Sequence, residues 1–338
     1  MINFLIILII LFFLGIYLQK KNFLVDNTGF SKHKSFVKSS KKIPVTGGLF
    51  LLLTFIFFNL INLDFIYSCL LLLIFSIGFF SDLSNNFSPK IRFIIQIFIT
   101  LIFILNTQNF VTDTRIEFIN NLFLNYKFIS IFFTLFCILV LINGTNFIDG
   151  INLSVAGYYL LIFISLFYLT SQHEIIIDKN ILNNLIKITL ALFIINSLNK
   201  TQLGDGGAYL IAFITGFMII DFINLNKIAS PYFAINLLWY PCLENLFSIF
   251  RKILIKKDIS RPDNHHLHHL IYLYLKQKKI KFPNNFSGIF ILLFNCLAIT
   301  MSTLYFQNTI NQLQILLMCI LVYIFSYFVL KKKLKIKL

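Results

Sequence analysis

The sequence is poor in charged residues, and this scarcity excludes an ordinary soluble fold. Only 12% of its 338 residues are charged, with 13 Asp or Glu in all, whereas 58% are hydrophobic. Soluble domains carry roughly 25% charged and 45–50% apolar residues. The five cysteines stand singly and form no CxxC pair, so neither a disulfide framework nor a zinc knuckle is indicated. A cleaved signal peptide is not expected, because residues 2–18 lack a small-residue cleavage site and are followed by Lys20 and Lys21.

Long apolar runs recur along the whole chain instead. Each run of about 17–20 residues can cross the hydrocarbon core as a helix, and lipid favours helices because every backbone group must be bonded internally. We therefore predict an all-α integral membrane protein whose 338 residues form a single polytopic domain. The expected spans number about eleven and lie near residues 2–18, 45–62, 65–80, 93–108, 127–142, 154–170, 181–197, 207–223, 229–248, 285–306 and 313–330.

The distribution of positive charge predicts the orientation of these spans. With the N-terminus in the periplasm, 24 of the 29 Lys and Arg residues fall on the cytoplasmic side, including the basic tail 331–338. This bias fits the positive-inside rule for a protein of the bacterial inner membrane, with the C-terminus in the cytoplasm. The net charge of +16 would also suit anionic membrane lipids or phosphorylated substrates, and nothing about it indicates nucleic acid.

Several acids recur on the cytoplasmic side in unusual local contexts. Asp205 stands in LGDGGAY, where flanking glycines let a phosphate or a metal approach the backbone closely. A carboxylate there is a natural Mg²⁺ ligand, although a plain turn between helices would have the same composition. Asp82 stands in SDLSNNFSPKIR near Lys90 and Arg92, which suggests phosphate handling or a charge pair at a helix end.

A second acid, Asp149, belongs to a polar stripe. Asn143, Asn146, Asp149 and Asn152 recur every third residue in NGTNFIDGIN. Residues three apart share one face of a helix, so the stripe could hold a sugar, a base or a hydrated metal. The alternative is a polar helix end that satisfies its own backbone.

The densest polar element is RPDNHHLHH, with Asp263 and a run of histidines at His265, His266, His268 and His269. Neutral imidazoles could bind zinc, but no cysteine stands nearby. Contact with phosphates, or a surface run without a role, are the alternatives. The helix before this run carries Glu244 and Arg251, and KKIPVTGG offers Lys41 and Lys42 at a helix entrance suited to an anionic headgroup.

These elements, in this order between residues 41 and 269, resemble the polyprenyl-phosphate hexosamine-1-phosphate transferases of glycosyltransferase family 4, the WecA- and MraY-type enzymes. KKIPVTGG looks like the family's Pro…Gly-Gly entrance, NGTNFIDG like its Asn-x-x-Asn-x-x-Asp-Gly loop, LGDGGAY like its Gly-Asp-x-Gly loop, and DNHHLHH like its histidine signature. YPCLENLFSIFRK looks most like the branch that initiates surface-polysaccharide repeat units.

The resemblance implies transfer of a sugar 1-phosphate, of N-acetylhexosamine type, from a UDP-sugar to undecaprenyl phosphate. UMP is released at the cytoplasmic face, Mg²⁺ is required with Mn²⁺ as a substitute, and a lipid-linked glycan such as O-antigen is begun. The implied catalytic residues are Asp82, Asp149, Asp205 and His266, with Asp205 and Asn146 as metal ligands. The implied substrate-binding residues are Lys41, Lys42, Asn143, Asn146, Asn152, Arg251, Asp263, His268 and His269.

The sequence departs from the family pattern in two places. Ser81-Asp82 stands where the family has paired acids, and DGINL lacks the second glycine of the family's loop. We still predict an active enzyme with Ser81 as a neutral substitute. A phosphate monoester acceptor has its second pKa near ~6, so phosphoryl transfer needs positioning and charge neutralisation more than a base.

Two other readings stay open on the sequence: a transporter or flippase, and a catalytically silent relative. Transporters place ionisable residues near the bilayer midplane, whereas here the motif acids gather at one interface. The identity of the sugar, the downstream polymer, the choice between direct attack and a covalent intermediate, and the oligomeric state (a homodimer included) are not determined by the residues.

Overall fold

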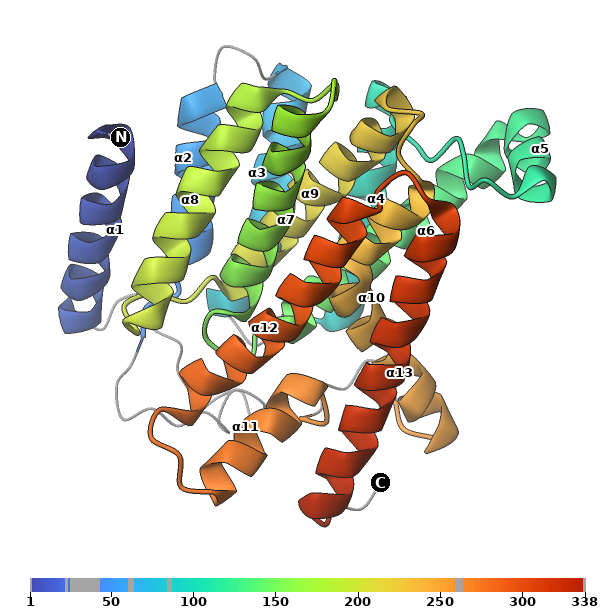
Figure 1. The fold of residues 1–338 in the computed structure, drawn as a ribbon. Helices are drawn as coiled ribbons and strands as arrows, with labels where there is room; N and C mark the ends of the chain where they lie inside the picture. The colour runs from blue at the N-terminus through green and yellow to red at the C-terminus, as the bar shows by residue number, and fades with distance from the viewer. Residues whose placement is uncertain are drawn as a thin grey trace.

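The computed structural model describes residues 2–21, 24, 43–59, 64–83, 87–258 and 264–336. Within these ranges the chain forms helices joined by turns and loops, without a β-strand (Figure 1). The helices are α1 (Ile2–Lys21), α2 (Gly47–Asn59), α3 (Phe65–Leu83), α4 (Pro89–Thr107), α5 (Glu117–Asn125), α6 (Lys127–Ile148), α7 (Ser154–Gln172), α8 (Lys179–Ser197), α9 (Gly204–Leu225), α10 (Pro231–Leu254), α11 (Leu267–Gln277), α12 (Pro283–Leu304) and α13 (Thr309–Lys333). The predicted all-α membrane fold is confirmed.

Each of the eleven predicted spans coincides with one of these helices. Nine helices in the described residues are long and apolar enough to cross a membrane: α3, α4, α6, α7, α8, α9, α10, α12 and α13. Helix α2 is shorter, at 13 residues. It ends at Asn59 and α3 begins at Phe65, so the two predicted segments are separate helices. The number of crossings stays a prediction.

Two helices, α5 and α11, were not predicted. They have 9 and 11 residues, which at 1.5 Å per residue is too short to span a bilayer. Both alternate apolar and polar residues, so neither forms an uninterrupted apolar run. Figure 1 shows that α5 projects sideways at the upper end of the bundle, whereas α11 lies across its lower end.

Helix α9 is the centre of the bundle and packs against α2, α3, α6 and α10. In its most apolar stretch 72% of the residues are buried, against 17% in α13. Glycines allow a close crossing between α3 and α9: a Cβ on Gly78 would lie 2.4 Å from the backbone nitrogen of Gly206. The tight packing of α3 against α9 therefore requires glycine at this crossing.

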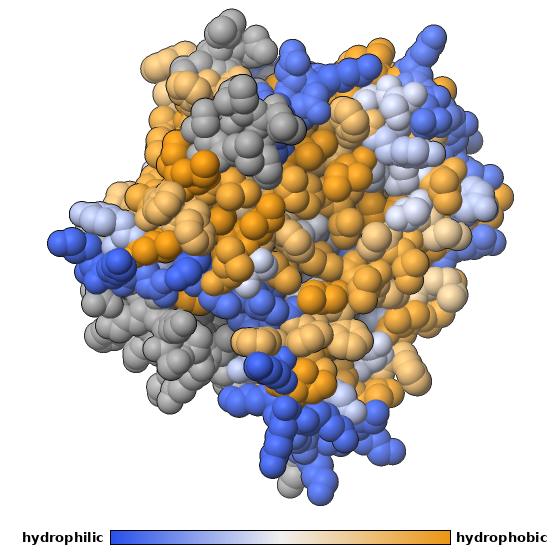
Figure 2. All heavy atoms as spheres, turned by 60° about the vertical axis from the view of Figure 1, so that its left-hand side comes forward, coloured by the Kyte–Doolittle hydropathy of each residue, from blue (hydrophilic) through white to orange (hydrophobic). Residues whose placement is uncertain are grey.

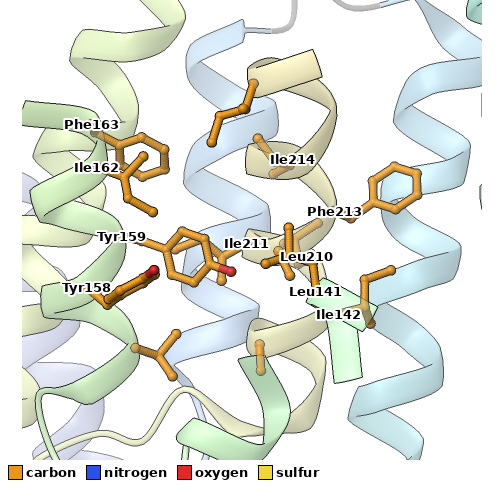
Figure 3. Packing of buried hydrophobic residues seen from close by; sticks show 14 of the residues in the cluster. Leu141, Ile142, Tyr158, Tyr159, Ile162, Phe163, Leu210, Ile211, Phe213 and Ile214 are labelled. Atoms are coloured by element: carbon orange, nitrogen blue, oxygen red, sulfur yellow. The ribbon is translucent and has the colours of Figure 1, made fainter. Parts of the chain in front are cut away.

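The core around α9 combines aliphatic side chains with buried tyrosines (Figure 3). The Tyr159 hydroxyl bonds the Thr145 hydroxyl at 2.6 Å, and the Tyr158 hydroxyl donates to the Leu237 carbonyl at 2.7 Å. A buried hydroxyl is costly without a partner, so these bonds join α7 to α6 and to α10. Residues of α6, α7 and α9 interdigitate here: Leu141, Ile142, Tyr158, Tyr159, Ile162, Phe163, Leu210, Ile211, Phe213 and Ile214.

The surface carries an apolar belt between two polar ends (Figure 2). Large side chains in this belt stay exposed, among them Phe57, Leu297 and Phe325. An apolar surface of this extent would be unfavourable in water, and it is the surface that we expect to face lipid.

The sequence motifs gather at one end of the bundle, the lower end in Figure 1, which we call the motif end. It holds the last turns of α3, α6 and α10 and the first turns of α9 and α11, with Asp82, Asp149, Gly204 and His266. The other end, here called the opposite end, holds Arg115, Asp178 and Asn308. That the motif end faces the cytoplasm stays a prediction.

Candidate active site

The N-terminus of α9 is the meeting point of two predicted catalytic carboxylates. The Asp149 Oδ2 accepts the Gly204 N–H at 3.1 Å, and the two oxygens of Asp82 accept the N–H groups of Asp205 and Gly206 at 3.1 and 3.3 Å. The first N–H groups of a helix have no partner within the helix and carry a partial positive charge. Carboxylates from the ends of α3 and α6 therefore converge on one helix start.

Gly204 makes this helix start possible. Its φ of +75° lies in the left-handed region, which disfavours a Cβ. A Cβ there would also lie 2.6 Å from the Asp82 Oδ2. The preceding residues pair with the entrance to α2, since Gly47 and Gly48 donate to the carbonyls of Gln202 and Leu203, both at 2.9 Å. Backbone hydrogen bonds therefore join the glycine pair of KKIPVTGG to the start of LGDGGAY.

The third carboxylate, Asp205, points to a different set of partners. Its Oδ2 accepts from the Ser81 hydroxyl at 3.0 Å and forms an ion pair with the Arg92 Nη1 at 2.9 Å. The same Arg92 nitrogen donates to the Ser81 hydroxyl at 2.6 Å and to the Tyr209 hydroxyl at 3.3 Å. The Arg92 and Asp205 side chains are 18% and 17% exposed, so the pair borders solvent.

Ser81 therefore sits between an arginine and an aspartate. Its hydroxyl accepts from Arg92 and donates to Asp205, which a carboxylate at this position could not do. That Ser81 is a neutral substitute for an acid stays a prediction, and these two hydrogen bonds are compatible with it.

Residues 265–269, which we call the histidine segment, lie against the loop after Asp149. A Cβ on Gly150 would lie 2.7 Å from the His269 Nε2 and 2.8 Å from the His268 Nε2. The His266 ring stacks on His268, with ring centroids 5.5 Å apart, and contacts Phe147 at 5.0 Å. The structure brings the predicted histidines together with Asp149, although they are more than a hundred residues apart.

His268 is the most deeply placed imidazole of the segment. Its side chain is fully buried, and neither ring nitrogen has a hydrogen-bond partner. Burial, reinforced by the neighbouring His269 and His266, lowers the pKa of His268 well below its usual value, so the ring is neutral at pH 7. A buried polar side chain without partners is rare and suits a ligand that would supply them.

Sequence reasoning did not select Glu244, which the structure joins to the histidines. Glu244 accepts from His266 Nδ1 and from the Leu267 N–H, both at 2.9 Å. Arg251, predicted to bind substrate, donates to the His265 carbonyl and to the Tyr327 hydroxyl. Glu244 and Arg251 are seven residues apart, about two helical turns, and that spacing was the available signal.

The four-residue polar stripe predicted around Asp149 is only partly formed. Helix α6 ends at Ile148, so Asn152 lies beyond it and leaves the stripe. The Asn152 amide instead donates to the side chains of Asn199 and Asn285 at 2.6 and 2.7 Å. Asn143 donates to the Gln96 side chain at 3.1 Å. Substrate binding by these asparagines stays a prediction, as it does for Lys41, Lys42 and Asp263, which lie outside the described residues.

The donor atoms at the motif end fit a Mg²⁺ site that substrate completes. Mg²⁺ usually takes one or two carboxylates together with substrate phosphates. Asp205 offers a carboxylate at the border of solvent. From Asn146 only the side-chain carbonyl oxygen could bind Mg²⁺. The buried Asn146 Nδ2, which has no hydrogen-bond partner, is a donor and suits a substrate oxygen. No group of three or more His, Cys, Asp or Glu within the described ranges could hold a metal ion. Substrate phosphates would therefore have to supply further ligands.

Comparison with known proteins shows which family the central part of the chain resembles. Residues 65–223 match the family model described as "Glycosyl transferase family 4". Over this region the chain is similar to glycosyl transferase family 4. The family 4 region contains Asp82, Asn146, Asp149 and Asp205, and it ends before the histidine segment.

One curated relative is similar to a larger part of the chain. It is the "Probable undecaprenyl-phosphate N-acetylglucosaminyl 1-phosphate transferase" of Bacillus subtilis (strain 168), 26% identical over 198 residues. The match covers 56% of this chain and 52% of the relative. The chain thus matches about half the length of that relative.

Proposed function

We propose that this protein transfers a sugar 1-phosphate from a UDP-sugar to a polyprenyl phosphate, undecaprenyl phosphate in bacteria, and releases UMP. The observation that carries the proposal is the convergence of Asp82 and Asp149 on the first amides of α9, beside Asp205, within a membrane protein similar to family 4. Three carboxylates at one helix start, at the end of an apolar bundle, suit chemistry between a soluble nucleotide and a lipid.

The proposed reaction makes and breaks one type of bond. An oxygen of the polyprenyl phosphate bonds to the phosphorus that carries the sugar, and the bond from that phosphorus to UMP breaks. The acceptor is largely dianionic at neutral pH because its second pKa is near ~6. The protein must therefore bring two anions together and needs little proton transfer.

Arg92 and Asp205 would help to offset the negative charge of the two phosphorylated substrates. Arg92 can bind a phosphate oxygen through the same guanidinium that it now turns to Asp205. We propose that Asp205 and Asn146 hold Mg²⁺, which neutralises charge on the donor's diphosphate when bound. Asp82 and Asp149 fix the start of α9 and so fix where the Asp205 side chain is presented.

The histidine segment would bind the donor. The buried, partnerless His268 and the adjacent His269 border Gly150, one residue from Asp149. A diphosphate or sugar hydroxyl could supply the missing partners of His268. Lys41, Lys42 and Asp263, which lie outside the described residues, remain proposed substrate-binding residues.

The setting of the reaction is proposed from charge. We place the motif end in the cytoplasm of a bacterial inner membrane, where the excess of Lys and Arg belongs. The donor would be of UDP-N-acetylhexosamine type, and the product would begin a lipid-linked envelope glycan such as O-antigen, as in the surface-polysaccharide branch.

The test is UMP release by the full chain in detergent or nanodiscs, with a panel of UDP-sugars and undecaprenyl phosphate. We expect turnover with at least one N-acetylhexosamine donor, loss of turnover on chelation with recovery on adding Mg²⁺, and loss in Asp82→Asn and Asp205→Asn. Full activity in both variants would refute the assignment. Absence of Mg²⁺-dependent exchange of labelled UMP into every donor would favour a flippase or a silent relative.

A further inference from the structure

Two side chains of α10 form hydrogen bonds with three consecutive residues of the histidine segment. Arg251 donates a hydrogen bond to the His265 carbonyl. Glu244 accepts hydrogen bonds from the His266 side chain and from the Leu267 N–H. The two α10 residues are 5% and 1% exposed. Charged side chains this deeply buried are costly unless they are paired, so this contact specifies a single placement for the segment.

Each oxygen of Glu244 has its own donor. Oε1 accepts the Leu267 N–H, the first amide of α11. The side chain of the N-cap residue, His266, makes no hydrogen bond to the first amides of this helix. Oε2 lies 2.9 Å from His266 Nδ1. Helix α11 is therefore capped from another helix, and its position is tied to that of the His266 ring.

The bond also selects the tautomer of His266. An ionised carboxylate can only accept, so Nδ1 must carry a proton. In the neutral ring Nε2 is then the acceptor, and in the cation it is a second donor. The ring's orientation is set as well, by the stacked His268 and by Phe147.

We propose that Glu244 is a positioning residue for the transfer reaction, which holds His266 in the Nδ1-protonated tautomer and docks α11 so that the histidines meet Gly150. This inference rests on the proposed function, because it assigns Glu244 a role through His266. Glu244 itself need not touch substrate. Its contribution is to present one defined ring nitrogen, Nε2, to the donor.

Glu244→Gln separates the two contacts of Glu244. The amide oxygen can still accept the Leu267 N–H, so the cap on α11 remains. The amide nitrogen can only donate, so it would require an unprotonated Nδ1 and would move the His266 proton to Nε2. The variant therefore keeps size and cap and reverses the tautomer.

We expect Glu244→Gln to lower kcat about 10–100-fold, the effect typical of losing a residue that orients a functional histidine, with KM within about threefold. ¹⁵N-histidine NMR in nanodiscs, with the His266 signal assigned by its loss in His266→Asn, should show the proton on Nδ1 in the wild type and on Nε2 in the variant. In the His266→Asn background, Glu244→Gln should cause little further loss.

Asp178→Asn is the matched control. Asp178 accepts the Asn180 and Ile181 N–H groups at 2.8 and 3.0 Å at the start of α8, far from the histidines. It should change neither kcat nor the His266 signal. An unchanged kcat in Glu244→Gln, an unchanged tautomer, or additive losses in the double variant would each overturn the inference. A wild type without activity would refute the proposed function, while the tautomer measurement would still test the contact.

Discussion

The two ends of the bundle satisfy their helix termini in different ways. At the opposite end, two helices are capped by residues next to them in sequence: Asp178 caps α8, and Asn308 accepts the Asn311 N–H at the start of α13. At the motif end, the caps come from other helices. Asp82 and Asp149 serve α9, and Glu244 serves α11.

Arg115 extends the contrast at the opposite end. Its guanidinium donates to the carbonyls of Gln307 and Ala229, and to the Thr309 hydroxyl, in the loops after α12 and α9. A cation there matches the negative ends of helices. Local caps and a carbonyl-binding arginine stabilise the opposite end, whereas caps between helices bring several acids to one point. That difference supports our proposal that the motif end is the active site.

The largest expected effect is on UMP release, and it distinguishes two capping aspartates. Asp149→Asn keeps an acceptor oxygen for the Gly204 N–H but removes a charge from the proposed site, and we expect about a 100-fold or larger loss of UMP release. Asp178→Asn makes the same chemical change at the opposite end and should leave turnover unchanged. Equal effects in the two variants would remove the functional distinction between the ends.

The next effect concerns Arg115. Arg115→Met should lower the free energy of unfolding by about 1–2 kcal/mol, because several carbonyls lose a charged donor at a solvent-exposed position. Turnover per folded molecule should stay the same. Thermal unfolding in detergent, with activity measured alongside, provides the check. Lys127→Met is the control and should cost less, because it removes one hydrogen bond to Gln108 and one cation–π contact with Phe110.

The third prediction is a pH dependence at the motif end. Burial lowers the pKa of His268 in the folded protein, whereas the unfolded residue titrates near ~6.5. The unfolded state therefore binds more protons as pH falls, and folding weakens by about 1.4 kcal/mol between pH 7.5 and 5.5 from this residue.

His268→Asn should flatten this dependence, measured as the unfolding midpoint against pH. His173→Asn, which removes an exposed imidazole at the opposite end, should leave the slope as it is in the wild type. If the unfolding midpoint of His268→Asn varied with pH as steeply as that of the wild type, burial of His268 would not be the source of the pH dependence.

The smallest effect is expected at Ser81. Ser81→Ala removes the hydrogen bond to Asp205 and the one from Arg92, while the ion pair between Arg92 and Asp205 remains. We expect a two- to fivefold loss in UMP release, corresponding to about 1 kcal/mol or less. A loss as large as that of Asp149→Asn would mean that the hydroxyl acts directly on substrate.

The predictions from sequence succeeded for the long apolar segments. Apolar runs located the eleven long segments, because a helix needs about 20 consecutive apolar residues to span the bilayer. The signal failed for α5 and α11, which are short and mixed in character. It also overextended the stripe from Asn143 to Asn152, since three-residue spacing implies a shared face only while the helix continues, and α6 ends at Ile148.

The sequence by itself determined that the chain is a helical membrane protein and which acids and histidines stand out from it. Only the tertiary structure decided their pairing: Asp82 and Asp149 on the amides of α9, Asp205 with Arg92 and Ser81, and Glu244 with His266. The physical reason is that each of these contacts joins residues from different helices. Their geometry depends on how those helices pack around α9, and no spacing along the chain encodes it.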